Sequence, residues 1–174
     1  SPLVLGNMVI VEATFTCALD KTTGKEIWRS KKYKPAYGTP VAFQFKDRLY
    51  IATLKTDGLV ILDAQTGKTV ASQDWRTSFR TNSATPIIIG KKSFLSTGYQ
   101  RGCALFEFTG NGLKQIYTNK HLSNHMNNSV VLGDFIYGFD GNTHGRTPKQ
   151  IVCLRLADGA VQWRKDGYLC GSLM

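Results

Sequence analysis

Short apolar runs rich in β-branched and aromatic residues recur along the whole chain, and polar or glycine-containing segments separate them. Clear examples are Met8–Val11, Leu49–Thr53, Phe94–Ser96 and Phe135–Phe139. Runs of this kind, bounded by turn residues, are typical of β-strands. No segment has the periodicity of an amphipathic helix. The pattern therefore predicts an all-β protein.

One turn motif recurs between these predicted strands. The sequences "CALDKTTGKEIW" from Cys17, "VILDAQTGKTV" from Val60 and "VCLRLADGAVQW" from Val152 align, and "CALFEFTGNGLKQIY" from Cys103 is a weaker copy. Glycine supplies the positive φ of a tight turn between strands at little steric cost. The recurrence predicts one hairpin of this kind in each repeat. The residues that carry the pattern are Asp20, Gly24, Trp28, Asp63, Gly67, Gly159 and Trp163.

The same turn contains Gly67-Lys68-Thr69, the last three residues of a phosphate-binding loop motif. That motif also needs a glycine five positions before Gly67, because this first glycine opens the turn that directs backbone N–H groups at the anion. The chain has Leu62 there. We therefore interpret the segment as a hairpin turn and not as a nucleotide site.

A second marker, a Ser or Thr before an apolar run, recurs in step with the turns. It stands at Ser1, Thr39, Thr85, Ser129 and Ser172, at intervals of about 38 to 46 residues, and four strands in such an interval are typical of a β-propeller blade. A β-sandwich would explain the strands but not the matching period. We predict one β-propeller segment, 1–174, of about four four-stranded antiparallel blades within a larger propeller. The repeats are 1–38, 39–84, 85–128 and 129–171, and a further repeat starts at 172.

The segment "ALDKTTGKEIW", residues 18–28, resembles the repeat of pyrroloquinoline-quinone-type (quinoprotein-type) propellers. The resemblance implies that a tryptophan at the end of the motif docks each blade on its neighbour, a role that falls on Trp28 and Trp163. In the second repeat Ala71 stands at the expected position and Trp75 follows four residues later. In the third repeat Tyr117 takes the place of the tryptophan.

Propellers of this family commonly have more than four blades. An open propeller segment exposes apolar faces at its terminal blades, and such faces favour association. We therefore expect either a fragment of a longer chain or self-association through the open blade edges.

The composition excludes some classes of protein but does not identify a ligand. Hydrophobic residues make up 42% and charged residues 20%, and the formal net charge is +10. The charge allows attraction to anionic partners, but no aromatic and basic strand pattern supports nucleic-acid binding. No apolar run is long enough for a membrane span. The four cysteines are far apart and form no C-x-x-C motif, so their pairing stays open.

The connections between blades are the first place where a ligand site is expected. They precede the predicted innermost strands, so their last residues would ring one mouth of the central channel, on the face opposite the glycine turns. Variable loops on a rigid scaffold often bind ligands. Equally, asparagine often satisfies the backbone groups of a turn. The candidate ligand-binding residues are Tyr37, Arg80, Asn82, Ser83, His125, Asn127 and Asn128.

The predicted loops between second and third strands lie on the same face, and several of them contain basic residues. These residues lead to the hypothesis of an acidic partner. Two metal patterns are incomplete: "HLSNH" from His121 lacks the glutamate of a zinc-protease helix, and "DGNTHG" from Asp140 lacks the glutamate that completes a calcium loop. We expect no metal site at either. The basic loop residues are Lys55, Arg101, Arg146 and Lys149.

The function expected from these features is a non-catalytic propeller scaffold that binds protein, polysaccharide or other anionic partners, without a cofactor. The alternative is part of a quinone-dependent alcohol or sugar dehydrogenase with pyrroloquinoline quinone and calcium. That enzyme class often has an adjacent cysteine pair, which this chain lacks. We assign no catalytic residues. The resemblance also implies the cell envelope, the periplasm or secretion.

Overall fold

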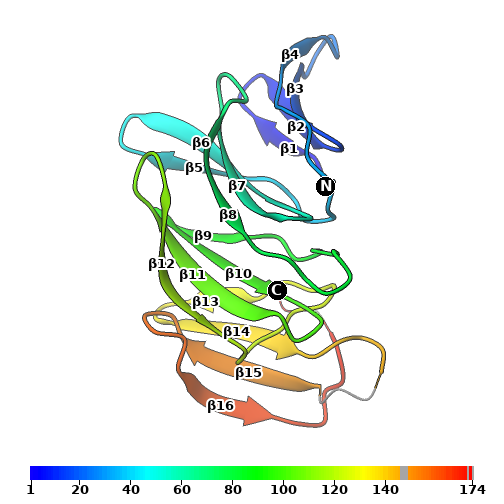
Figure 1. The fold of residues 1–174 in the computed structure, drawn as a ribbon, viewed down its shortest axis with the longest axis vertical. Coiled ribbons are helices and arrows are strands. Elements are labelled where there is room, and N and C mark those ends of the chain that lie inside the picture. The colour runs from blue at the N-terminus through cyan, green and yellow to red at the C-terminus, as the bar shows by residue number, and fades with distance from the viewer. Residues whose placement is uncertain (146–148, 172, 174) are drawn as a thin grey trace.

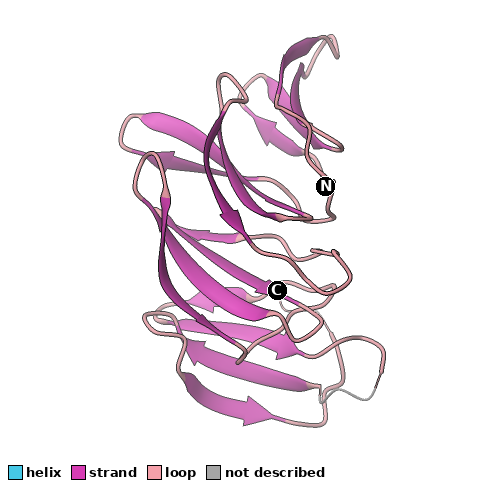
Figure 2. Ribbon diagram, in the orientation of Figure 1, coloured by secondary structure: helices cyan, strands magenta, loops and turns pink. Residues whose placement is uncertain are grey.

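The structure is a computed structural model that describes residues 1–145, 149–171 and 173. The described residues contain strands and loops but no helix (Figure 2). The strands form four separate four-stranded antiparallel sheets, and each sheet is built from consecutive strands. The predicted all-β fold with four antiparallel blades is confirmed.

Blades 1 and 2 come from the first half of the chain. In each blade the strand order follows the sequence. Blade 1 consists of β1 (Leu3–Leu5), β2 (Met8–Glu12), β3 (Thr16–Asp20) and β4 (Glu26–Arg29), and blade 2 of β5 (Val41–Phe45), β6 (Arg48–Lys55), β7 (Gly58–Asp63) and β8 (Thr69–Asp74).

Blades 3 and 4 repeat this arrangement and stack below blade 2 in Figure 1. The first strands β5 and β9 contact each other, as do the last strands β8 and β12. Blade 3 consists of β9 (Ile87–Ile89), β10 (Lys92–Thr97), β11 (Gly102–Phe108) and β12 (Leu113–Asn119), and blade 4 of β13 (Val130–Leu132), β14 (Phe135–Asp140), β15 (Gln150–Arg155) and β16 (Val161–Lys165).

The two kinds of loop lie on opposite sides of blades 2 to 4. The turns between first and second strands and between third and fourth strands lie on the left in Figure 1, except that the β7–β8 turn lies at the top, and we call this the turn side. The loops between second and third strands and the connections between blades lie on the right, and we call this the loop side. The seven candidate ligand-binding residues all come from connections, so they belong to the loop side.

The recurring sequence motif forms one recurring hairpin. The N–H of Gly24 donates to the carbonyl of Asp20 at 2.8 Å, and the N–H of Gly67 donates to the carbonyl of Asp63 at 2.9 Å. In each of these turns the aspartate also accepts hydrogen bonds from the backbone N–H of the threonine three residues later. Gly24 and Gly67 have φ of 71° and 69°, which favour glycine.

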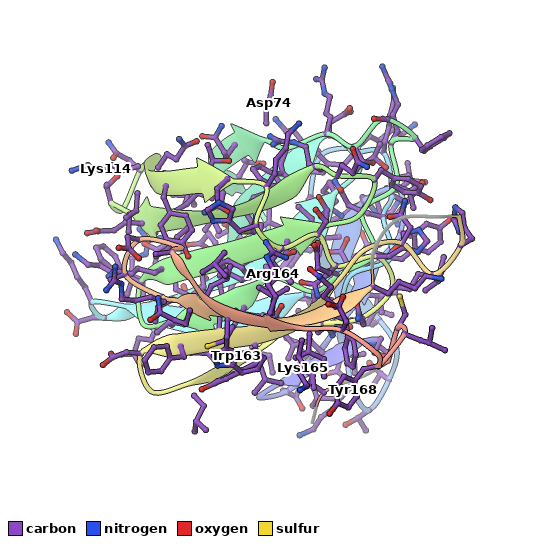
Figure 3. The ribbon with its side chains drawn as sticks, turned by 90° about the horizontal axis from the view of Figure 1, so that it is seen from below. Asp74, Lys114, Trp163, Arg164, Lys165 and Tyr168 are labelled. Atoms are coloured by element: carbon purple, nitrogen blue, oxygen red, sulfur yellow. The ribbon has the colours of Figure 1, made fainter. Side chains whose placement is uncertain are left out.

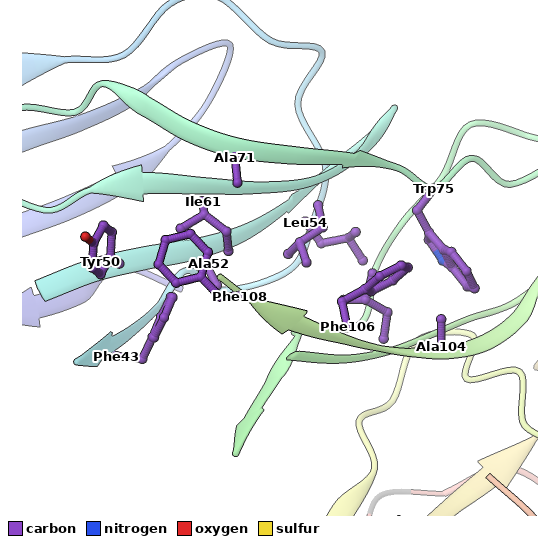
Figure 4. Close-up of a cluster of buried hydrophobic side chains, with 12 residues drawn as sticks. Phe43, Tyr50, Ala52, Leu54, Ile61, Ala71, Trp75, Ala104, Phe106 and Phe108 are labelled. Carbon is purple, nitrogen blue, oxygen red and sulfur yellow. The ribbon is translucent and has the colours of Figure 1, made fainter. Parts of the chain in front are cut away.

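Three buried clusters fill the seams between neighbouring blades. The cluster between blades 2 and 3 contains Trp75, Phe106 and Phe108, and all three are almost fully buried (Figure 4). The seam between blades 1 and 2 contains Ile10 and Trp28, among others, and a third cluster joins blades 3 and 4. Because each sheet buries its faces against its neighbours, the blades stabilise one another.

Aromatic side chains dock one blade on the next across two of these seams. Trp28 of blade 1 packs on Gly67 of blade 2 so closely that a Cβ atom on this glycine would lie 2.3 Å from the ring. The Trp28 indole donates to the carbonyl of Ala64 at 3.1 Å. Tyr117 packs in the same way on Gly159 of blade 4, where a Cβ atom would lie 2.6 Å from the ring.

The seam between blades 2 and 3 is docked by Trp75, the tryptophan that stands four residues after the expected position. Trp75 is 1% exposed, and its indole donates to the hydroxyl of Thr97 in blade 3 at 2.8 Å. The last tryptophan, Trp163 on β16, is 45% exposed, and Figure 3 shows β16 nearest the viewer. At the Gly24 turn of blade 1, a Cβ atom on this glycine would have no neighbouring atom within 4 Å. Within the described residues, blade 4 thus presents an undocked ring and blade 1 an uncovered turn.

Candidate functional site

The candidate residues lie along successive seams of the loop side. The N–H of Tyr37 donates to the carbonyl of Asn82 at 3.0 Å, the amide oxygen of Asn128 accepts from the N–H of Thr85 at 2.8 Å, and the amide of Asn127 donates to the carbonyl of Gly171 at 2.9 Å. These bonds connect different blades or connections. The residues are therefore spread over several seams and do not converge in one pocket.

Asn82 is fully buried at 0% exposure. Its amide nitrogen donates to the carbonyl of Lys55 at 2.8 Å and to that of Trp75 at 3.0 Å. A buried amide that holds loop carbonyls in this way satisfies backbone groups that water cannot reach. The structure thus gives Asn82 a role in fixing the loops of blade 2.

Arg80 and Ser83 lie in the same connection. Arg80 is exposed and has φ of 54°, and its N–H donates to the carbonyl of Thr77 at 3.0 Å in a tight turn. Ser83 is half-buried. Tyr37, in the preceding connection, is 75% exposed.

Lys55 does not belong to the exposed basic face, and its assignment there was wrong. Its side chain is 2% exposed and forms an ion pair with Glu12, whose side chain is 11% exposed. The ammonium also donates to the hydroxyl of Thr16 at 3.0 Å. Of the other basic loop residues, Arg101 and Lys149 are half-buried, and Arg146 lies outside the described residues.

His125 sits at the centre of an aromatic cluster between the loops of blades 3 and 4. Its ring centre lies 4.9 Å from that of Tyr99 and 5.0 Å from that of His144. His125 is 3% exposed. Its Nδ1 accepts from the N–H of Thr143 at 3.3 Å, which places the proton of the neutral ring on Nε2. Nε2 is buried and has no hydrogen-bond partner among the described residues.

Burial lowers the pKa of His125, and the neighbouring His144 acts in the same direction. The unfolded chain therefore takes up this proton at a higher pH than the folded protein does. The contribution to stability is complete above the ordinary histidine pKa of about 6.5 and is lost as the pH falls through the lowered value.

This loss of stability at low pH predicts a measurable difference between the parent and a variant without His125. We expect the free energy of unfolding to fall more steeply between about pH 7 and 5 in the parent than in His125→Gln, because the variant lacks the titrating group. Urea unfolding across this range measures the two slopes. His121→Gln is the matched control, since His121 is exposed, and it should keep the parental slope. Equal slopes in the parent and His125→Gln would contradict the assignment.

Two neighbouring hollows open on the loop side next to this cluster. The first, the basic hollow, has a volume of about 340 Å³ and is lined by Arg76, Ser78, Tyr99, Gln100, Arg101 and Lys120. The second, the polar hollow, has a volume of about 370 Å³ and is lined by Gln100, Lys120, Ser123, Asp140, Gly141, Asn142, Gln150 and Arg164. Gln100 and Lys120 line both. None of the seven candidate residues lines either hollow.

The polar hollow is held by a network around Arg164 of β16, which Figure 3 labels. Its guanidinium lies 3.3 Å from a carboxylate oxygen of Asp140 and donates to the carbonyl of His121 at 2.8 Å. Asp140 also accepts from the N–H of Ser123 at 2.7 Å. Burial raises the pKa of Asp140 despite these contacts. The polar groups on this wall already have partners within the protein.

The sequence alone did not point to most of these hollow residues. Arg101 was singled out as a basic loop residue, but Tyr99, Gln100 and Lys120 were not. The only local signal is the segment "TGYQRG", in which two glycines enclose the loop between β10 and β11. The hollows form because this loop meets segments of blades 2 and 4 that are distant in sequence.

In the part of the chain that the structure describes, the side-chain donors do not fit a metal centre. Among the described residues, no three His, Cys, Asp or Glu side chains come together in a way that could hold an ion. His121 is exposed, and its Nδ1 lies 3.0 Å from the carbonyl of Gly159, whereas His125 faces Thr143. The side chain of Asp140 is engaged by Arg164 and Ser123. No quinone chemistry can be derived from these residues.

Exposed apolar side chains form a second feature of the loop side. The segment after each of the four blades contains one or two exposed apolar side chains. These side chains therefore recur along the loop side from blade 1 to blade 4. The residues and their exposed fractions are Tyr37 (75%), Phe79 (71%), Met126 (67%), Tyr168 (56%) and Leu169 (70%).

Comparison with known proteins identifies the family. The model of the family described as "Outer membrane protein assembly factor BamB" matches residues 1–165. The chain belongs to this family. This confirms the resemblance to quinoprotein-type repeats. A search of curated proteins gave no significant sequence match.

Solved structures show the same fold. BamB from Moraxella catarrhalis matches with a TM-score of 0.71 and 21% identity over 96% of this chain and 48% of that chain. Quinohemoprotein alcohol dehydrogenase from Comamonas testosteroni matches with 0.66 and 15% identity over 95% and 34%. A europium-containing methanol dehydrogenase matches with 0.62 and 14% over 95% and 41%. This chain spans about half the length of the BamB structure.

Proposed function

We propose that this chain is a non-catalytic scaffold of the cell envelope that binds protein partners through its loop side and takes part in the assembly of outer membrane proteins. Membership of a family described as an outer membrane protein assembly factor supports this proposal. A scaffold needs a rigid frame that presents loops, and a propeller of mutually packed blades provides it. The described residues contain no helix that could cross a membrane.

The observation that carries the proposal is the row of exposed apolar residues on the loop side. Phe79, Met126 and Leu169 come from three successive connections, and each is at least 67% exposed. A contiguous group of large exposed apolar side chains is typical of a protein interface. Basic residues of the two hollows lie beside them, and arginine next to aromatic residues is typical of the centre of an interface.

Site-specific photo-cross-linking in the source organism tests this proposal. A photoreactive phenylalanine analogue is placed at Phe79 or Met126 on the loop side, in the full-length gene. The matched control carries it at Lys68, an exposed residue of a hairpin on the turn side. We expect discrete cross-linked products with envelope proteins from the two loop-side positions and none from position 68, because the proposed docking surface lies on the loop side.

Two outcomes would contradict this proposal. Equal cross-linking yields from the two sides, or none from the loop side, would show that the exposed apolar residues are not a docking surface. Saturable binding of pyrroloquinoline quinone with calcium, measured by absorbance and thermal shift, would instead support the dehydrogenase alternative. The similarity to the two dehydrogenase structures, at 15% and 14% identity, supports the shared fold and not the reaction.

Self-association is a further part of the proposal. The undocked ring of Trp163 and the uncovered turn at Gly24 are the two halves of the contact that joins Trp28 to Gly67. Two chains could therefore pair blade 4 of one with blade 1 of the other through the same packing.

A further inference from the structure

We propose that the basic hollow between the loops that follow or belong to blades 2 and 3 binds an acidic segment of a protein partner, and that Arg101, Arg76 and Lys120 hold its carboxylates. This inference rests on the proposed scaffold function and names the chemistry of the partner. It concerns an interior seam of the chain and does not depend on the terminal blades.

Arg101 is the first reason for an anionic ligand. Its guanidinium carbon lies 3.5 Å from the ring centre of Trp75, so the planar group is stacked on a buried indole. Burial lowers the pKa of this guanidinium. No described carboxylate lies within ion-pair distance of Arg101. A partly desolvated cation without a counter-ion is costly, and an incoming carboxylate would supply the missing partner through two parallel hydrogen bonds.

The neighbours of Arg101 increase the positive charge of the basic hollow. Lys120 is exposed and also has no ion-pair partner among the described carboxylates. Arg76 lies 3.1 Å from Asp57, in an exposed pair that contributes little to stability and can exchange partners. The basic hollow therefore combines one stacked arginine with two accessible cations and has no acidic residue in its lining. This charge distribution favours a ligand with more than one carboxylate.

The loop that presents Arg101 is held in a defined shape. Tyr99 and Gln100 have φ of 58° and 57°, a conformation that costs a non-glycine residue about 1–2 kcal/mol. The N–H of Tyr99 donates to the side-chain oxygen of Asn142 at 2.8 Å. At Gly98 a Cβ atom would lie 2.8 Å from the ring of His125. These contacts fix the loop before a ligand arrives, which lowers the entropic cost of binding.

The surroundings favour a protein segment over an acidic polysaccharide. The Phe79 ring contacts that of Tyr99 at a tilt of 51°, with ring centres 4.7 Å apart. Phe79 is 71% exposed, and Met126, next to His125, is 67% exposed. A flexible methionine and an exposed phenylalanine offer contacts to apolar side chains of a peptide. The adjacent polar hollow offers the side-chain amide of Gln100, which can hydrogen-bond a peptide backbone. The two hollows together fit an extended segment with alternating acidic and apolar residues.

Fluorescence anisotropy with a defined probe tests this inference. The probe is a short fluorescein-labelled peptide of alternating glutamate and leucine, and the comparison peptide has glutamine in place of glutamate. At about 50 mM salt, where screening is weak, we expect the acidic peptide to bind at least about tenfold more tightly than the neutral one. Raising the salt to about 0.3 M should weaken the acidic peptide only.

Matched charge reversals separate this site from the general positive charge of the chain. The double variant Arg76→Glu with Lys120→Glu should weaken the acidic peptide about tenfold or more, because both residues line the basic hollow. The control Lys68→Glu with Lys114→Glu makes the same charge change on the turn side, where Figure 3 shows Lys114 away from Tyr168. The control should change affinity by less than about threefold, since its residues are remote from the hollow.

The indole N–H resonance of Trp75 tests whether the peptide binds in the basic hollow. Only Trp75 of the three tryptophans lies under Arg101, so its indole N–H resonance should shift on titration, while those of Trp28 and Trp163 stay unchanged. Equal weakening by both double variants, or no preference for the acidic peptide, would overturn the inference. Binding of polygalacturonate but not of the peptide would also overturn it. If loop-side cross-links still form in these cases, the scaffold proposal stands and only the acidic-segment inference fails.

Discussion

Replacing Glu12 with glutamine is expected to lower the free energy of unfolding by about 3 kcal/mol or more, because it leaves the Lys55 ammonium buried without a counter-charge. The Lys55 side chain is 2% exposed. Thr16 is fully buried and links the two, since its hydroxyl donates to Glu12 at 2.7 Å and accepts from Lys55 at 3.0 Å. Urea unfolding followed by tryptophan fluorescence measures the change.

An exposed pair in the same blade provides the matched control. Glu26 and Arg29 form an ion pair with side chains 39% and 49% exposed, so Glu26→Gln should cost about 0.5 kcal/mol or less. The second variant, Glu12→Gln with Lys55→Met, should recover much of the loss because it removes the unpaired charge. Similar effects of Glu12→Gln and Glu26→Gln would contradict the assignment of Glu12 in β2 and Lys55 in β6 as a buried ion pair between blades 1 and 2.

The second large effect is expected at Gly67. Gly67→Ala should lower the free energy of unfolding by about 3 kcal/mol, because the new methyl group meets the Trp28 ring and the backbone is in the left-handed region. The Cβ position lies 2.3 Å from the ring, and φ is 69°. The ring can move only by giving up its hydrogen bond to the carbonyl of Ala64. Near-ultraviolet circular dichroism should report the displaced indole.

Gly24 is a matched control for the backbone part of this effect. It occupies the same position of the same turn, with φ of 71°, but nothing lies within 4 Å of its Cβ position. Gly24→Ala should therefore cost only about 1 kcal/mol. The difference between the two variants measures the ring contact between blades. If both variants lost the same free energy, backbone strain alone would account for the effect and ring docking would not.

The number and type of blades could be predicted because the signals are local. An aspartate, a threonine and a glycine at fixed spacing form the same hydrogen-bonded turn at Asp20 and Asp63, and this geometry depends only on neighbouring residues. The fourth repeat replaces the aspartate by Arg155, yet the N–H of Gly159 donates to its carbonyl at 2.8 Å in an equivalent turn. The glycine spacing was therefore the more general signal.

The docking aromatic residues were only partly predictable. Trp28 docks where the family motif places it, but Trp75 reaches the next blade from a position four residues later. Sequence spacing cannot reveal this displacement, because the distance that a side chain must span depends on the shape of the neighbouring blade.

The chain by itself determined the all-β class, the four blades and the two-sided arrangement of turns and loops, because these follow from short-range hydrogen bonding and strand patterning. Only the tertiary structure decided which polar residues are available to a ligand. Lys55 is neutralised by Glu12, 43 residues away, and Asn82 is used to hold loop carbonyls. The hollows around Arg101 and Lys120 likewise form where loops of three blades meet. Burial and charge pairing arise from contacts between distant segments, and the order of residues does not specify these contacts one by one.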